Sequence, residues 1–135
     1  MLIKSARKIL LLTSFLILLL TLSACRRGSS QDIPEIGIDL TVNPNPPGVG
    51  AATLSLVLSD AQGHPIDGAI IEVEGNMSHA GMAPVFTQAV ETEPGHYEAP
   101  IEFTMGGDWF VLVKATLPDG RQLERQIDLP AVISS

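Results

Sequence analysis

The sequence has little cysteine and few basic residues. Its 135 residues include a single Cys, so no intrachain disulfide can form. Lys and Arg number 8 against 15 Asp and Glu, for a formal net charge of -7. Affinity for phosphate backbones comes from clustered basic side chains, so this acidic balance excludes nucleic acid as the partner. No Gly-rich phosphate loop and no nucleophile on a strained turn is visible, and we expect no enzymatic activity.

Long apolar runs are absent from most of the chain but not from its start. Three basic residues lie among the first eight positions, and residues 9–22 then form a run with nothing more polar than Ser or Thr. This is the anatomy of a signal peptide. A spanning helix needs about 20 apolar residues, so the run is short for a permanent anchor. We therefore predict that residues 1–24 are a lipoprotein signal peptide.

The end of this segment explains the single cysteine. Residues 22–25, Leu-Ser-Ala-Cys, resemble the lipobox of bacterial lipoproteins, in which a peptidase cuts before the cysteine and the thiol carries a diacylglycerol. The resemblance implies lipidation at Cys25; a retained signal anchor with an idle thiol is the alternative. Two or more acyl chains anchor stably, since each buried methylene adds about 0.8 kcal/mol. We expect an extracytoplasmic protein on the bacterial cell membrane, the outer membrane in a Gram-negative host.

The mature chain is more acidic than the whole sequence. Loss of the leader removes three basic residues and no acidic one, which leaves 5 Lys and Arg against 15 acids, a net charge of -10. Residues 26–36, RRGSSQDIPEI, are polar with Gly, Ser and Pro. As a flexible coil such a stretch spans roughly 18 Å. We therefore interpret residues 25–36 as the lipidated Cys25 and a tether that holds the next domain near the membrane.

Residues 37–131 alternate between apolar and polar with period two, and turn residues interrupt the alternation every eight to twelve positions. The pattern predicts an all-β domain, an immunoglobulin-like seven-stranded sandwich without its disulfide. The first six predicted strands are 38–42, 52–59, 69–74, 85–91, 96–103 and 109–116. A seventh strand closes the domain, with Leu123, Ile127 and Leu129 facing inward.

The chemically distinctive residues are methionines and one histidine. Met77, His79 and Met82 follow the third predicted strand, and Met105, the remaining mature methionine, follows the fifth. If successive strands alternate in direction, these two connections emerge at the same end, beside the 44–47 proline segment. Thioether sulfur binds Cu(I) well and imidazole binds both copper oxidation states, whereas zinc prefers Cys and His. These four residues are therefore a candidate metal site, with Cu(I) favoured.

Structural interpretations of the same residues remain open. The inward register of the third strand extends to Met77 and that of the fifth to Met105, and methionine often fills gaps at the end of a core. Phe110 and Leu112 are out of phase with Trp109, so the sixth strand is apolar on both sides and is either covered by a loop or forms a contact surface. Three acidic pairs fit the solvated faces of strands: Glu72/Glu74, Glu91/Glu93 and Glu98/Glu102.

Four motifs in order resemble the YtkA-like domain, which is related to the FixH group. They are DAQGHPIDGA at 60–69, Met77-x-His79-x-Gly81-Met82, Pro94-Gly95-x-Tyr97 and Met105-Gly-Gly-x-Trp109. The resemblance runs from about residue 40 to Leu129. It implies an extracytoplasmic immunoglobulin-like module associated with copper handling, as in cytochrome oxidase maturation and copper-efflux adaptors, and it assigns copper to Met77, His79, Met82 and Met105. This chain has a lipobox in place of the FixH-type transmembrane helix, and it has no Met- or His-rich tail.

Two hypotheses of different class follow. In the first, a membrane-anchored lipoprotein captures or passes on copper, and its partner is an envelope copper-handling or oxidase-assembly protein. In the second, the domain is a structural or protein-interaction module of the cell envelope that binds no metal. It would then dock through the Met and His end or through the Phe110/Leu112 face.

Overall fold

The computed structural model describes residues 36–79 and 81–134, so the predicted signal peptide, Cys25 and nearly all of the tether lie outside the described residues. Its strands are β1 (Gly37–Asn43), β2 (Gly50–Ser59), β3 (Ile70–Met77), β4 (Val85–Glu93), β5 (His96–Phe103), β6 (Trp109–Thr116) and β7 (Gln122–Asp128). All seven predicted strands are confirmed, and the ends of the six that were predicted with bounds differ from expectation by three residues at most. Within the described part of the chain, no helix is long and apolar enough to cross a membrane.

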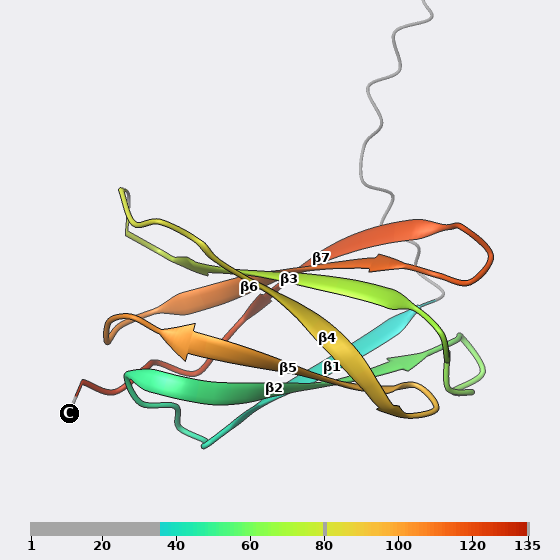
Figure 1. Cartoon of the computed structure of the whole chain (residues 1–135), viewed down its shortest axis with the longest axis horizontal. Helices are drawn as coiled ribbons and strands as arrows, with labels where there is room; N and C mark the ends of the chain where they lie inside the picture. The colour runs from blue at the N-terminus through green and yellow to red at the C-terminus, as the bar shows by residue number, and fades with distance from the viewer. Residues whose placement is uncertain (1–35, 80, 135) are drawn as a thin grey trace, which may run out of the picture.

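The seven strands form one antiparallel sheet, ordered β1-β2-β5-β4-β3-β6-β7 and nearly closed on itself (Figure 1). β4 makes the sheet continuous, because it pairs first with β3, through 85–89, and then with β5, through 90–93. Figure 1 shows β4 crossing from the layer of β3, β6 and β7 to that of β1, β2 and β5. The two layers pack face to face, which confirms the immunoglobulin-like sandwich.

The core lies between the two layers and follows the predicted alternation. Every second residue of β2, β3, β5 and β6 is buried, including Leu54, Leu56, Leu58, Ile71, Val73, Tyr97, Ile101, Phe103, Trp109, Val111 and Val113. Ile36, which the sequence assigned to the tether, is only 4% exposed and packs in this core. The rings of Phe103 and Trp109 pack edge to face with centroids 5.2 Å apart. The domain is therefore anchored by aromatic packing near the β5–β6 turn.

The connections divide between two ends of the sandwich. The β1–β2, β3–β4 and β5–β6 connections leave at one end, here called the Met/His end, and the other three leave at the opposite end (Figure 1). β1 begins at the opposite end, because Gly37 pairs with Ser59, the last residue of β2. The predicted placement of Met77, His79, Met82 and Met105 at a common end therefore agrees with the observed strand directions.

Residues 130–134, here called the C-terminal strap, cross the Met/His end. Ile133 donates to the Pro47 carbonyl at 2.8 Å and accepts from the Val49 amide at 3.1 Å. Val132 exchanges two backbone hydrogen bonds with Gly107, both at 2.9 Å, and its side chain is buried. The strap thus ties the β1–β2 connection to the β5–β6 turn.

Polar contacts fix the opposite end. The Tyr97 hydroxyl donates to the Ile66 carbonyl at 2.8 Å and accepts from the Ala69 amide at 3.1 Å. Burial raises the pKa of this hydroxyl, so it stays protonated and donates at neutral pH. The Glu91 carboxylate accepts from the backbone amides of Gly68 at 3.0 Å and Gly95 at 3.2 Å. The β2–β3 connection is therefore bonded to both β4 and β5.

These contacts predict a pH dependence of stability. The hydrogen bond from the Gly68 amide, followed by that from the Gly95 amide, holds the pKa of Glu91 below its ordinary value. A carboxyl whose pKa is lower in the folded state stabilises the fold above its unfolded pKa, about 4.3, and this contribution is lost as the pH falls through the folded pKa. Glu91→Gln should therefore destabilise the protein at pH 7 and flatten the fall in its urea midpoint below pH 5.

The control for Glu91→Gln is Thr92→Ala, which removes no titrating group from the same strand. Its urea midpoint should follow the wild-type pH profile. An unchanged profile in Glu91→Gln would contradict the assigned role of the carboxylate.

Candidate functional site

Met77 is the last residue of β3 and pairs with Trp109 across the β3–β6 ladder. Its side chain is 9% exposed and belongs to the core. A Cβ placed on Gly107 would lie 3.3 Å from the Met77 methyl carbon, so the thioether reaches the β5–β6 turn. The packing interpretation therefore describes Met77, and its sulfur lies behind the surface of the Met/His end.

Met105 lies in the β5–β6 turn, and its side chain is 49% exposed. The inward register of β5 ends at Phe103, where the strand itself ends, so the alternation does not continue to Met105. The core-packing interpretation of Met105 was wrong for this reason. The turn is nevertheless held in place, because the Trp109 indole N–H donates to the Met105 carbonyl at 3.0 Å.

His79 and Met82 lie in the β3–β4 connection, His79 exposed and Met82 38% exposed. The Ser78 amide donates to the Asp108 carbonyl at 3.1 Å and joins the start of this connection to the β5–β6 turn. Beyond Ser78 the tip of the connection stands away from that turn (Figure 1). The structure thus places Met77, at the end of β3, against the β5–β6 turn that carries Met105, with His79 and Met82 at the same end on the projecting β3–β4 connection.

The side chains at this end have a limited set of donor atoms. In residues 36–79 and 81–134, no group of three or more His, Cys, Asp and Glu side chains could hold a metal ion. The four predicted ligands at the Met/His end supply three thioether sulfurs and one imidazole. Neutral sulfur is a poor ligand for hard cations and a good one for Cu(I). The donor set suits a soft cation and no hard one.

The other two histidines lie at the opposite end, as the sequence predicted. The His64 ring nitrogen Nδ1 lies 3.1 Å from the Asp60 carboxylate, and the pKa of Asp60 is lowered, chiefly by the hydrogen bond from the His64 amide. His96 is exposed at the start of β5. Asp60 also accepts from the Gln62 amide at 2.9 Å, so this cluster closes a turn.

Sequence reasoning missed one exposed group beside the Phe110/Leu112 face. Phe86, on β4, is 71% exposed, while Phe110 and Leu112 are only half-buried. Glu74 pairs with Phe86 on one side and with Leu112 on the other, so the two apolar residues flank it on one face. The signal available in the sequence was that Phe86 is out of phase with the inward-facing positions of its strand. The structure adds that no residue of β4 is fully buried.

The chain is similar to solved structures of other proteins. The soluble domain of PmoD from Methylocystis sp. ATCC 49242 (Rockwell) matches with a TM-score of 0.50 at 14% identity, over 73% of this chain and 97% of that domain. MtrC from Shewanella baltica OS185 matches with a TM-score of 0.45 at 16% identity, over 74% of this chain and 22% of MtrC. Murine CRIg matches with a TM-score of 0.41 at 14% identity, over 73% of this chain and 98% of CRIg.

Family membership comes from the sequence itself. No curated protein matches the chain. The family described as YtkA-like matches residues 31–114, which is more than half of the 135 residues and includes β1 to β5, the β3–β4 connection and Met105. The motifs at 60–69, 77–82, 94–97 and 105–109 all fall within this range, and the fold is the all-β sandwich that the resemblance implied. The chain therefore belongs to the YtkA-like family.

Proposed function

We propose that this protein is a lipid-anchored, extracytoplasmic, non-enzymatic copper-handling protein that binds Cu(I) at the Met/His end. The supporting observation is the exposure of two thioethers, Met82 and Met105, together with the His79 imidazole on adjacent connections. Exposed methionine is costly as packing, because its apolar surface stays in water. Its polarisable sulfur is useful there as a ligand for a soft cation.

The geometry suggests how copper would be captured as cargo. Met105 is fixed by the Trp109 hydrogen bond, whereas His79 and Met82 lie on the projecting loop. Gly81 in that loop has a φ of +90°, with nothing within 4 Å of a Cβ added there. We propose that this loop folds onto the β5–β6 turn when copper binds. His79 and Met82 would then meet Met105, with the Met77 sulfur behind it.

Exposure also suits release of the cargo. Thioether ligands are neutral and hold Cu(I) without the charge of a thiolate, and a partner protein can reach Met82 and Met105 from solvent. We propose an envelope copper-handling or oxidase-assembly protein as that partner. A carrier of this kind needs no catalytic group.

The anchor is a separate part of the proposal. It rests on the lipobox-like residues 22–25 and places the diacylglycerol on Cys25. Mass spectrometry of the protein extracted from membranes should find Cys25 at the N-terminus with the mass of its acyl chains. An unmodified Cys25 would refute the anchor without bearing on copper.

Titration of Cu(I) tests the site. Residues 26–135 contain the whole core and all seven strands, so this chain serves for measurements under reducing conditions against a chromophoric competitor. We expect the double variant His79→Ala, Met82→Ala to bind Cu(I) at least about tenfold more weakly, a change of about 1.4 kcal/mol. The single Trp109, bonded to the Met105 turn, should report binding through its fluorescence.

The matched control is His96→Ala, the same loss of imidazole at the opposite end. It should retain wild-type affinity. Equal affinity of the wild type and the double variant would exclude the proposed site.

A further inference from the structure

The outer side of β3, β4 and β6 exposes more large apolar side chains than a solvated sheet face needs. The three most exposed large hydrophobic side chains of the described residues lie on β3 and β4: Phe86 at 71%, Val90 at 68% and Ile70 at 63%. Half-buried Leu112 of β6 lies across Glu74 from Phe86. We call this outer side the β3/β4/β6 face. Such a surface marks an interaction site.

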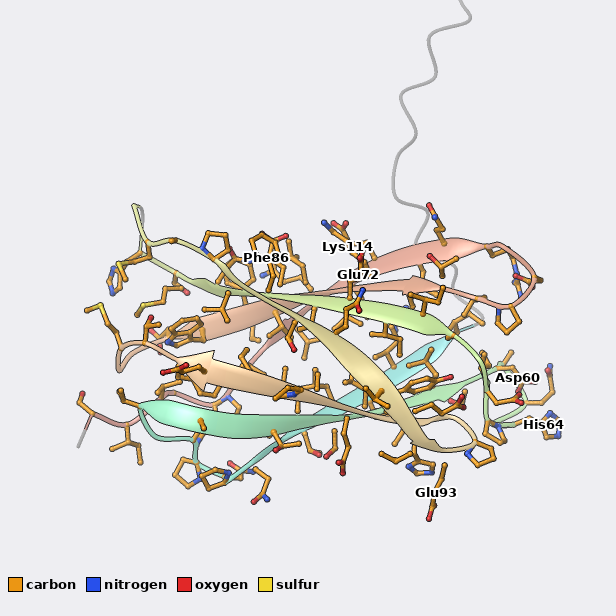
Figure 2. All side chains as sticks on the ribbon, in the orientation of Figure 1. Asp60, His64, Glu72, Phe86, Glu93 and Lys114 are labelled. Carbon is orange, nitrogen blue, oxygen red and sulfur yellow. The ribbon has the colours of Figure 1, made fainter. Side chains whose placement is uncertain are left out.

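Two adjoining hollows shape this face. One, of about 560 Å³, is lined by Phe86 and Gln88 of β4 together with Glu74. The other, of about 220 Å³, is lined by Ile70 and residues of β6 and β7. Glu72 and Lys114 line both hollows and therefore lie at the centre of the face. Figure 2 shows Phe86, Glu72 and Lys114 on the same side of the molecule.

At this centre Lys114 has two carboxylate partners, whereas Glu72 has no partner among the described residues. Lys114, the only lysine of the described residues, has its ammonium 3.6 Å from the Glu74 carboxylate and 3.8 Å from that of Glu124. Glu72 is exposed and has no hydrogen bond or ion pair within the described part of the chain. Glu72 stands between Gln88 of β4 and Lys114 of β6, and the Lys114 ammonium already faces two other carboxylates. An exposed carboxylate near an exposed aromatic ring is complementary to a cation.

We propose that the β3/β4/β6 face binds a segment of a partner protein in which Lys or Arg alternates with apolar residues. The cation would lie between the Glu72 carboxylate and the Phe86 ring, and the apolar side chains would pack on Ile70 and Leu112. The mature chain carries a net charge of -10, from 5 basic and 15 acidic residues, so a second copy or an anionic lipid surface meets repulsion that a basic segment does not.

A peptide titration followed by NMR tests this proposal. ¹⁵N-labelled residues 26–135 are titrated with acetyl-(Val-Lys)₃-amide and, separately, with acetyl-(Val-Glu)₃-amide. We expect saturable shifts confined to amides of β3, β4 and β6 with the basic peptide and none with the acidic one. Glu72→Gln and Phe86→Ser should each weaken binding at least fivefold. Both side chains are exposed, so neither variant disturbs the core.

The matched control is Glu102→Gln on β5, which makes the same charge change on the opposite layer, where Glu102 pairs with Ala51 of β2. It should bind as the wild type does. Equal weakening by Glu102→Gln and Glu72→Gln would show general charge attraction and overturn the proposal, as would shifts spread over both layers. Concentration-dependent shifts on this face without peptide would assign it to a second copy and would equally overturn it. None of these results depends on copper.

Discussion

Replacing Trp109 with alanine should lower the free energy of unfolding by about 3–5 kcal/mol. The indole is 2% exposed, packs edge to face on Phe103 and ends the β3–β6 ladder opposite Met77. Its removal leaves a cavity between the two layers at the Met/His end. It also removes the hydrogen bond that fixes the Met105 carbonyl. Trp109→Ala should therefore weaken Cu(I) binding as well, even where the protein remains folded.

Two variants separate the contributions of Trp109. Trp109→Phe keeps an aromatic ring but loses the bond to Met105, so it should cost less stability than Trp109→Ala. Phe110→Ala truncates the neighbouring, half-buried ring on the outer face and should cost less again. Urea unfolding followed by far-UV circular dichroism suits all three, because Trp109 is the only fluorescent tryptophan. A loss in Trp109→Ala no larger than in Phe110→Ala would show that the indole does not organise this end.

Gly95→Ala should be the most destabilising small substitution, with a loss of about 2–5 kcal/mol. Gly95 has a φ of +75°, where a Cβ costs about 1–2 kcal/mol. A Cβ there would also lie 2.6 Å from the Pro65 Cβ and 3.0 Å from the Leu58 carbonyl oxygen. Both neighbours are rigid, and Leu58 donates its amide to the Gly95 carbonyl at 2.9 Å, so the β4–β5 turn cannot move away without losing this bond.

Gly120→Ala is the matched control for Gly95→Ala. Gly120 has a φ of +84°, but nothing lies within 4 Å of a Cβ added to it. It should therefore show the backbone strain alone, and the difference between the two variants measures the steric contact at Pro65. Equal urea midpoints for both variants would contradict that contact.

Most strands were predictable because apolar residues on one side alternate with polar residues on the other, and turn residues mark where the strands end. β5 and β6 were predicted with their observed bounds, 96–103 and 109–116. β3 ends three residues later than predicted, because Gly75 has no side chain to continue the alternation. The structure explains Gly75: a Cβ there would lie 2.9 Å from the Ile101 Cδ1, so the glycine makes room for a core side chain.

Features that depend on partners distant in sequence were not predictable. β4 pairs with β3 and then with β5. Because β4 has no fully buried residue, its apolar pattern does not indicate this change of partner. The C-terminal strap is hydrogen-bonded to Pro47 and Gly107, which both lie in connections between strands. The alternation of apolar and polar residues that predicts strands does not extend into these connections, so it could not predict the strap. For the candidate site, strand direction alone predicted a common end. The separation of Met82 from Met105 depends on loop conformation, which the sequence pattern does not determine.

The direction of β1 determines how the domain would stand on a membrane. β1 begins at the end opposite Met77 and Met105, so a lipid on Cys25 would hold that opposite end toward the bilayer. Strands of 7 to 10 residues are roughly 25–30 Å long, and the tether adds roughly 18 Å. With the domain upright on its tether, the Met/His end would face outward at a height of roughly 40–50 Å, within reach of the extramembrane parts of neighbouring proteins.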